Sequence, residues 1–263
     1  MRVVWAYRDY RKDKEGFFEL GSKFEQELFY VSVASWAKYA PTFERVAYFD
    51  SSTLEELQQG CPKIFDYLSK VEIIDWKEKI DKLYPNQLFS APKMWTYTQQ
   101  VEPFFICDTD MILLEPLRTW FDPAENWGIL YDFTTPSRMR ETSGREEFLA
   151  ILKNLDQSPV QRNFLDFTKS LNGGLVYFSR PETAQLVGLL TLTLGNQVIE
   201  RNSAETWILY EEASIPSLVE YIDAKKMKCI PNRMYVEHPN VVDSKKQEDI
   251  LTSIKRNLTN RIL

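Results

Sequence analysis

Short apolar runs rich in β-branched and aromatic residues alternate with helical patterns along this chain, and this alternation strongly limits the folds available to it. The expected strands are residues 3–7, 45–50, 70–76, 103–113, 126–133 and 173–180. Strands that alternate with helices predict a mostly parallel sheet with helices on both of its faces. We therefore expect an α/β fold, built as a single Rossmann-like domain around a central sheet.

Local start and stop signals place the helices between these strands. Two capping boxes mark helix starts, Ser22 with Glu25 and Ser52 with Glu55, and Pro41 and Gly60 mark the two ends. Further helices are expected over residues 91–100, 202–216 and 217–226. The tail spaces Ile250, Ile254, Leu258 and Ile262 on one helical face. We expect residues 1–240 to form one domain and residues 241–263 to form a C-terminal helix packed on it.

Composition excludes several classes of protein. The 263 residues carry a net charge of −6, which argues against nucleic-acid binding, because nucleic-acid binders usually present a basic surface. The three cysteines are far apart and fit no disulfide framework, so we expect reduced thiols and a cytoplasmic protein. The sequence shows neither a signal peptide at its start nor a transmembrane segment.

Two aspartates interrupt the apolar run 103–117, and they are the strongest candidates for a functional site. Asp108 and Asp110 are one residue apart, near the end of an expected strand. Residues two apart in an extended strand point to the same face, so both carboxylates would face one ligand. Ligands bind at the carboxyl ends of parallel strands. The pair predicts a site for Mn²⁺ or Mg²⁺, because these cations prefer carboxylate oxygens and often bind phosphates as well.

Weaker candidates lie elsewhere in the sequence. Asn172, Gly173 and Gly174 precede an expected strand, where glycine lets a ligand approach the backbone and the asparagine amide can bind sugar hydroxyls; an ordinary turn is an equal alternative. Lys93 begins a helix and can meet a phosphate, although most such lysines lie on the surface. The polar segment 134–148, which holds three arginines, reads as a loop or as a lid over a phosphate.

Three further residues complete the set of candidates. Glu211 and Glu212 end an amphipathic helix, and one of them can act as a general base or bind an acceptor hydroxyl; a solvated helix face is the alternative. His238 is the only histidine, and it is either a loop residue or a third metal ligand.

Together these segments resemble the GT-A-fold glycosyltransferases, in particular glycogenin-like enzymes and bacterial polysaccharide transferases. The resemblance rests on "KMWTYTQQVEPFFICDTDMILLEPL" and "LNGGLVYFSRPE". In that class a lysine-led helix precedes an apolar strand that ends in Asp-x-Asp, and an Asn-x-Gly segment follows later. Lys93, Asp108, Asp110 and Asn172 match this order. The glycine and lysine that commonly flank the late histidine of the class are absent around His238.

The resemblance implies a glycosyltransferase, of hexosyltransferase type, that moves a sugar from a nucleotide-diphosphate donor, such as a UDP-sugar, to a hydroxyl of a glycan or another acceptor. Asp108, Asp110 and His238 would hold the metal on the diphosphate, and Glu211 or Glu212 would serve catalysis. Residues Ala6, Tyr7 and Arg8 would lie by the nucleotide. Lys93, Asn172, Gly173 and Gly174 would lie by the donor sugar.

Two other readings stay open at this point. A protein with the same fold can bind a nucleotide sugar or a sugar without turnover. A phosphatase of the haloacid-dehalogenase type also uses Asp-x-Asp after an apolar strand, but there the motif usually opens the domain and continues with Thr or Val two residues after the second aspartate. Here about a hundred residues precede it, and Met111-Ile112 follow it.

Overall fold

The computed structural model describes residues 1–8, 23–84, 91–130 and 171–198, and shorter stretches after them: 215–216, 218–223, 227–231, 236–237, 249, 252 and 256. The chain divides into two compact units. Unit 1 comprises residues 1–74, 105–122 and 232–263, and unit 2 comprises residues 75–104 and 123–231.

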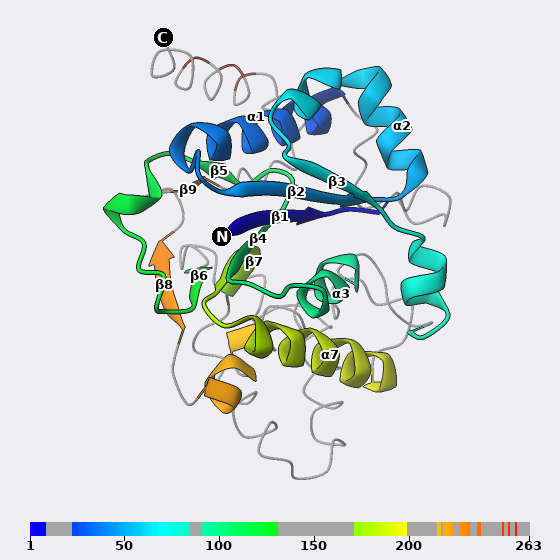
Figure 1. Ribbon diagram of the computed structural model, residues 1–263, viewed down its shortest axis with the longest axis vertical. Coiled ribbons are helices and arrows are strands. Elements are labelled where there is room, and N and C mark those ends of the chain that lie inside the picture. The colour runs from blue at the N-terminus through cyan, green and yellow to red at the C-terminus, as the bar shows by residue number, and fades with distance from the viewer. Residues whose placement is uncertain are drawn as a thin grey trace. The chain divides into compact units, whose positions relative to one another are not determined.

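Unit 1 is built on parallel strands. Strand β1 (Arg2–Ala6) pairs with β2 (Glu44–Phe49), and β2 pairs with β3 (Lys70–Ile73), both in parallel register. The helices α1 (Lys23–Tyr39) and α2 (Ser51–Gly60) lie on one side of these strands in Figure 1. Unit 1 also holds the 3₁₀ turns η2 (Pro62–Asp66) and η4 (Leu117–Thr119), and the short strands β5 (Ile112–Leu113) and β9 (Val236–Glu237).

The core of unit 1 is aromatic, and it explains why these strands and α1 stay together. Trp36 of α1 lies with its ring centroid 5.0 Å from that of Phe105, and Phe105 lies 4.9 Å from Phe121. Trp5 of β1 meets Trp36 edge to face at 6.4 Å. Trp5 and Trp36 are fully buried, and burial of each large ring contributes several kcal/mol, on the order of 25 cal/mol per Å² of apolar surface.

Unit 2 combines helices with a mixed set of strands. Strand β6 (Trp127–Leu130) pairs antiparallel with β7 (Leu171–Phe178) and parallel with β8 (Lys228–Pro231). Its helices include α3 (Ala91–Thr98), α7 (Pro181–Val198), the short π-helix η3 (Lys77–Asp81) and a helical stretch over residues 218–223. Figure 1 shows α3 and α7 side by side, in agreement with their many shared contacts.

Strand β4 (Phe104–Cys107) gives its first residue to unit 2 and the rest to unit 1. The strand order is β3-β2-β1-β4 in unit 1 and β7-β6-β8 in unit 2, and β5 and β9 form a separate pair. The prediction of an α/β fold with a mostly parallel sheet flanked by helices is confirmed. The division at residues 240 and 241 stays a prediction, because most of the tail lies outside the described residues.

One predicted helix start is wrong. Residue Asp50, and not Ser52, caps α2: its carboxylate accepts the N–H of Thr53 at 2.7 Å and the Ser52 hydroxyl at 2.9 Å. The helix therefore begins at Ser51. An aspartate is favoured at this position because its charge also interacts with the positive end of the helix.

Helix α7 was not predicted, and its sequence explains why. Its inner positions, such as Ala184 and Val187, are buried, while Leu186 and Leu189 on the other side are 46% and 48% exposed. A helix that is apolar on two sides shows no single apolar stripe.

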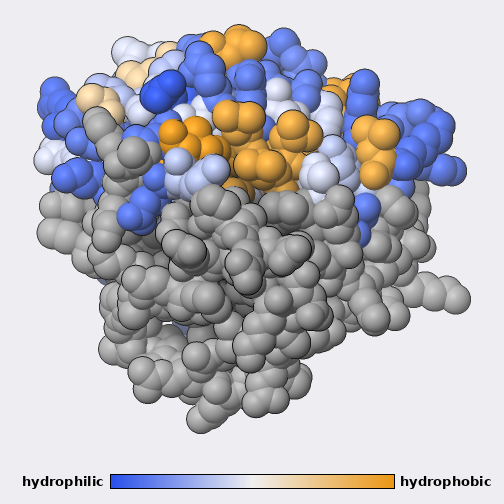
Figure 2. Space-filling view, turned by 90° about the horizontal axis from the view of Figure 1, so that it is seen from below, coloured by the Kyte–Doolittle hydropathy of each residue, from blue (hydrophilic) through white to orange (hydrophobic). Residues whose placement is uncertain are grey.

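Figure 2 shows apolar side chains gathered on the face of the molecule that it views. Within the described residues, no helix is long and apolar enough to cross a membrane.

Candidate functional site

The two candidate aspartates lie in a tight turn, and this corrects the expected strand geometry. Strand β4 ends at Cys107, and the N–H of Met111 donates to the carbonyl of Asp108 at 3.2 Å. That bond closes a turn over residues 108–111, so the rule that residues two apart share a face of a strand does not apply. Asp108 and Asp110 are both half-buried, while Cys107 before them and Met111 after them are buried.

The end of β1 lies in the same unit as this turn. Strand β1 is next to β4 in the strand order. The N–H of Tyr7 donates to the carbonyl of Tyr48 at 3.0 Å, which continues the pairing of β1 with β2 beyond Ala6. The side chains of Ala6, Tyr7 and Arg8 are half-buried. In unit 1 the predicted nucleotide segment therefore lies at the end of β1 and the aspartate turn at the end of β4, and these two strands are neighbours in the strand order.

A late segment of the chain returns to the aspartate turn. Strand β5 begins two residues after Asp110, and it pairs antiparallel with β9, with Ile112 opposite Glu237 and Leu113 opposite Val236. His238 itself lies outside the described residues. It follows Glu237 directly in the sequence. Sequence reasoning did not predict β9, because two residues are too few to show a pattern.

The donor atoms in this turn suit a hard cation. Two half-buried carboxylates in one turn supply oxygen ligands, which Mg²⁺ and Mn²⁺ prefer. Among the described residues, no three His, Cys, Asp or Glu side chains gather closely enough to hold a metal by themselves. The described carboxylates thus fit a cation that takes further ligands from a phosphate or from another segment of the chain.

In unit 2, Lys93 is buried rather than exposed on the surface. It lies in the first turn of α3 and keeps only 9% of its surface exposed, between Pro92 and Met94, which are also buried. Lysines are almost never buried to this degree unless they have a partner. The reading of Lys93 as an ordinary surface lysine is therefore wrong.

The segment Asn172-Gly173-Gly174 lies inside β7 and is not a turn before it. Gly128 of β6 is opposite Val176, but its neighbour Ile129 is opposite Asn172, so the register shifts at this point. Both glycines fall in the shift. An irregularity of this kind bends a strand, and such irregularities are common next to active sites.

Several candidates lie outside the described residues: Glu211, Glu212, His238 and the polar segment 134–148.

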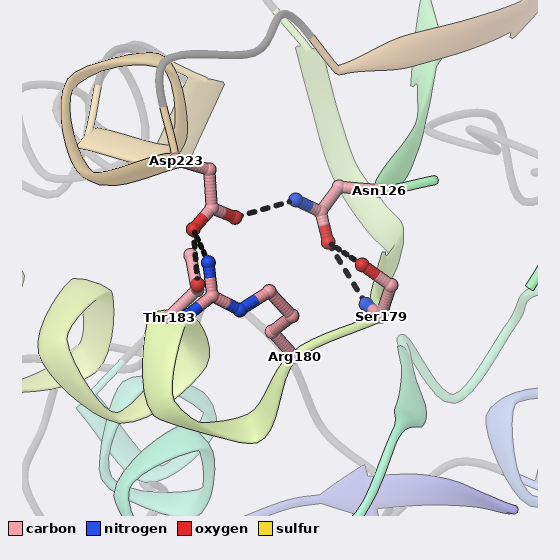
Figure 3. A network of polar contacts seen from close by, with 5 residues as sticks. All are labelled: Asn126, Ser179, Arg180, Thr183 and Asp223. Atoms are coloured by element: carbon pink, nitrogen blue, oxygen red, sulfur yellow. Dashed lines mark hydrogen bonds and ion pairs between the residues drawn. The ribbon is translucent and has the colours of Figure 1, made fainter. Parts of the chain in front are cut away.

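A network of polar side chains that the sequence did not reveal fixes the strands of unit 2 (Figure 3). Asn126, which is 6% exposed, accepts both the N–H and the hydroxyl of Ser179, at 2.8 and 3.0 Å. Its side-chain amide donates to Asp223, and its backbone carbonyl accepts the N–H of Lys228 at 2.8 Å. Asp223 also accepts the hydroxyl of Thr183 at 2.7 Å. The start of β6 is thereby joined to the end of β7, the start of β8 and the helical stretch 218–223.

Comparisons with known proteins found likeness only at the level of structure. No family model matches the chain, and no curated protein matches it. A galactosyltransferase, LgtC, solved with donor and acceptor sugar analogues, has a TM-score of 0.45 at 9% identity, over 88% of this chain and 73% of that one. Mouse xyloside xylosyltransferase 1 has a TM-score of 0.41 at 10% identity, over 83% and 80%. The PaToxG glycosyltransferase has a TM-score of 0.44 at 10% identity, over 97% and 75%.

Proposed function

We propose that this protein is a metal-dependent glycosyltransferase that moves a sugar from a nucleotide-diphosphate donor, such as a UDP-sugar, to a hydroxyl of a glycan or another acceptor. One observation carries the proposal: two half-buried carboxylates, Asp108 and Asp110, lie in a turn after β4, next to β1 in the sheet, with β9 paired just beyond them. An acidic protein with net charge −6 needs local positive charge or a metal cation to hold a diphosphate.

In this proposal Asp108 and Asp110 hold Mn²⁺ or Mg²⁺, which supplies Lewis-acid stabilisation of the leaving diphosphate. His238 is the proposed third ligand. Its support is the register of β5 with β9, which leaves His238 one residue beyond the partner of Ile112. The half-buried end of β1, Ala6 to Arg8, is the proposed contact for the nucleotide.

Two features of unit 2 are proposed to bind the donor. The burial of Lys93 supports a role for its ammonium group with a phosphate or a sugar. The register shift at Gly173 and Gly174 supports a close approach of backbone to the donor, with Asn172 as a partner for sugar hydroxyls. Glu211 or Glu212 is proposed as the catalytic or acceptor-binding carboxylate.

The first experiment is a thermal-shift titration with nucleoside diphosphates and UDP-sugars, with and without Mn²⁺. At a donor concentration of about one hundred times its Kd, bound ligand adds about 2.7 kcal/mol, and the melting temperature should rise on the order of 5 °C. The rise should require the metal. No metal-dependent shift with any nucleotide would rule out this function.

A matched pair of variants tests the aspartate turn directly. Asp110→Asn keeps the shape of the side chain but removes its charge, so metal-dependent nucleotide binding should be lost while the fold is kept. Asp122→Asn makes the same change at an exposed aspartate of unit 1 and should bind like the unmodified protein. Binding that survives in Asp110→Asn would remove the metal proposal.

Donor hydrolysis and sugar transfer distinguish a transferase from the alternative, a protein that binds the nucleotide sugar without turnover. A transferase hydrolyses its donor slowly when no acceptor is present, and it transfers the sugar when a suitable acceptor is added. We expect release of UDP from at least one UDP-sugar in the presence of Mn²⁺. Metal-dependent binding without any release of UDP would favour the binding protein.

A further inference from the structure

Two serines of α1 hold the backbone that directly follows the aspartate turn. The hydroxyl of Ser32 donates to the carbonyl of Met111 at 2.6 Å. The hydroxyl of Ser35 accepts the N–H of Leu113 at 3.0 Å. Both serines are fully buried, and so are Met111 and Leu113. The stretch that begins one residue after Asp110 is therefore tied to α1 at two points.

The geometry of β5 explains why hydroxyl groups are needed here. Backbone groups of successive strand residues point to alternate sides, so the bonded groups of Met111 and Leu113 face the same side. That side faces α1, while β9 pairs along the other side of β5. A buried backbone group without a partner is costly. The two serines therefore act in place of a missing strand along this side of β5.

Ser32 also connects the turn to β1. The indole N–H of Trp5 donates to the Ser32 hydroxyl at 3.3 Å, and the Ser35 hydroxyl donates to the carbonyl of Ser32 at 2.7 Å. Trp5 is fully buried and precedes Ala6, where the proposed nucleotide segment begins. One chain of hydrogen bonds therefore runs from β1 through α1 to the backbone beside Asp110.

We propose that Ser32 and Ser35 are positioning residues of the metal site, which hold the turn in the arrangement from which Asp108 and Asp110 bind the cation. This inference rests on the proposed function. Helix propensity alone favours alanine over serine at both positions, so the hydroxyls are explained by the groups that they bind. Residues that fix a metal ligand without touching the metal typically change its affinity 10- to 100-fold.

The test measures Mn²⁺ affinity in Ser32→Ala and Ser35→Ala, with Mn²⁺ alone and with Mn²⁺ plus UDP. Free Mn²⁺ is counted by its electron paramagnetic resonance signal at 25 °C, after circular dichroism has shown that each variant is folded. We expect the Kd for Mn²⁺ to rise about tenfold in each variant. Ser35→Ala keeps the bond between Trp5 and Ser32, so it carries the test if Ser32→Ala does not fold.

A second readout needs no metal. Hydrogen exchange of the Leu113 amide in the metal-free protein should be faster in Ser35→Ala, because that amide loses its buried acceptor. Exchange at Leu113 that stays as slow as in the unmodified protein would contradict the assigned contact and overturn the inference.

The matched control is Thr183→Val in unit 2. Thr183 is 1% exposed, and its hydroxyl donates to Asp223 at 2.7 Å, so the variant also loses one buried hydroxyl. It should lower the melting temperature and leave the Kd for Mn²⁺ unchanged. An equal loss of Mn²⁺ affinity in Thr183→Val, or an unchanged Kd for Mn²⁺ in both serine variants, would overturn this inference and leave the proposed function in place. An unmodified protein that binds no Mn²⁺, with or without UDP, would overturn the proposed function as well.

Discussion

The side-chain amide of Asn126 donates a hydrogen bond of 3.0 Å to the carboxylate of Asp223, across 97 residues of sequence. The same asparagine accepts two hydrogen bonds from Ser179. Asn126→Ala therefore leaves several buried groups without partners, and we expect it to lower the free energy of unfolding by about 2–4 kcal/mol. Urea unfolding at pH 7 measures the change. Arg180→Ala is the control: Arg180 also pairs with Asp223 but is 61% exposed, so its loss should cost less than about 1 kcal/mol.

Asn126→Asp replaces the donor with a second carboxylate facing Asp223. Two carboxylates this close repel each other when both are ionised, so in the folded protein the pKa of one of them is raised above its unfolded value. The destabilisation should be absent below about pH 4 and should grow as the pH rises above that value. Unfolding measured at pH 4 and pH 7 checks the sign. A variant that is equally destabilised at both values would contradict the repulsion.

The only histidine offers a direct probe of the proposed third ligand. We expect Mn²⁺ to broaden the imidazole proton resonances of His238, since a paramagnetic ion relaxes nearby nuclei strongly. Mg²⁺, which is diamagnetic, should shift the same resonances without broadening them. Loss of a residue that only supports a metal ligand typically weakens metal affinity 10- to 100-fold. Loss of a ligand should weaken it at least as much, so we expect His238→Ala to raise the Kd for Mn²⁺ by at least about tenfold. Sharp imidazole resonances with Mn²⁺ bound would exclude His238 from the metal site.

Gly188 decides how closely α7 approaches α3. A Cβ atom at this position would lie 2.5 Å from the backbone oxygen of Met94 and 2.9 Å from the Cβ of Tyr97. Alanine gains about 1 kcal/mol of helix propensity over glycine, but forcing an extra carbon into a packed contact costs about 1–3 kcal/mol. Because backbone atoms cannot move aside cheaply, we expect Gly188→Ala to lower the melting temperature.

Gly60→Ala is the matched control for that substitution. Its Cβ would meet the side-chain oxygen of Gln26 at 2.0 Å, which is closer still, but this oxygen is the far end of a flexible side chain. Gln26 can turn away, so Gly60→Ala should cost less than Gly188→Ala. The reverse order of melting temperatures would show that the distance alone, and not the kind of atom, sets the cost.

Tyr30 should make the stability of unit 1 sensitive to alkaline pH. Burial, followed by the hydrogen bond that the neutral Tyr30 hydroxyl makes with Tyr67, raises the pKa of Tyr30 above its ordinary value of 10.0. The unfolded chain then ionises first, so the contribution of Tyr30 is complete below about pH 10 and is lost as the pH rises through the folded pKa. Tyr30→Phe should reduce the fall in unfolding free energy between pH 8 and pH 10.5. Equal falls in both proteins would contradict this role.

Much of the fold was predictable because local patterns carry it. The helical period of residues 22–40 predicts one face with Phe24, Leu28, Val31 and Ser35; the last three are buried in α1, and Phe24 is half-buried. The first three strands lie close to the predicted positions, since apolar runs between polar turns need little context. The fourth predicted strand, residues 103–113, is divided by the turn over residues 108–111 into β4 and β5. Helix α7 and the strands β8 and β9 were not predicted, because packing with distant segments decides their structure.

The candidate site was predictable only in part. The aspartates stood out because carboxylates in an apolar run are costly, but the local geometry did not follow from the pattern: a single bond from Met111 to Asp108 turns the expected strand end into a turn. Asn126 gave no signal, since its partners are 53 and 97 residues away. The sequence gives no sign of a role for Ser32, because its contacts with Met111 and Trp5 lie 79 and 27 residues away along the chain.

The pairing of β5 with β9 has a consequence for the order in which this protein matures. The ribosome synthesises the two aspartates and β5 long before it reaches Val236 and Glu237. One side of β5 therefore stays unpaired until β9 has been synthesised. Contacts between segments so far apart in sequence also form slowly. The surroundings of the aspartate turn are therefore complete only after nearly all the other described elements have been synthesised. If the proposed metal site is present, a nascent chain should gain Mn²⁺ affinity late.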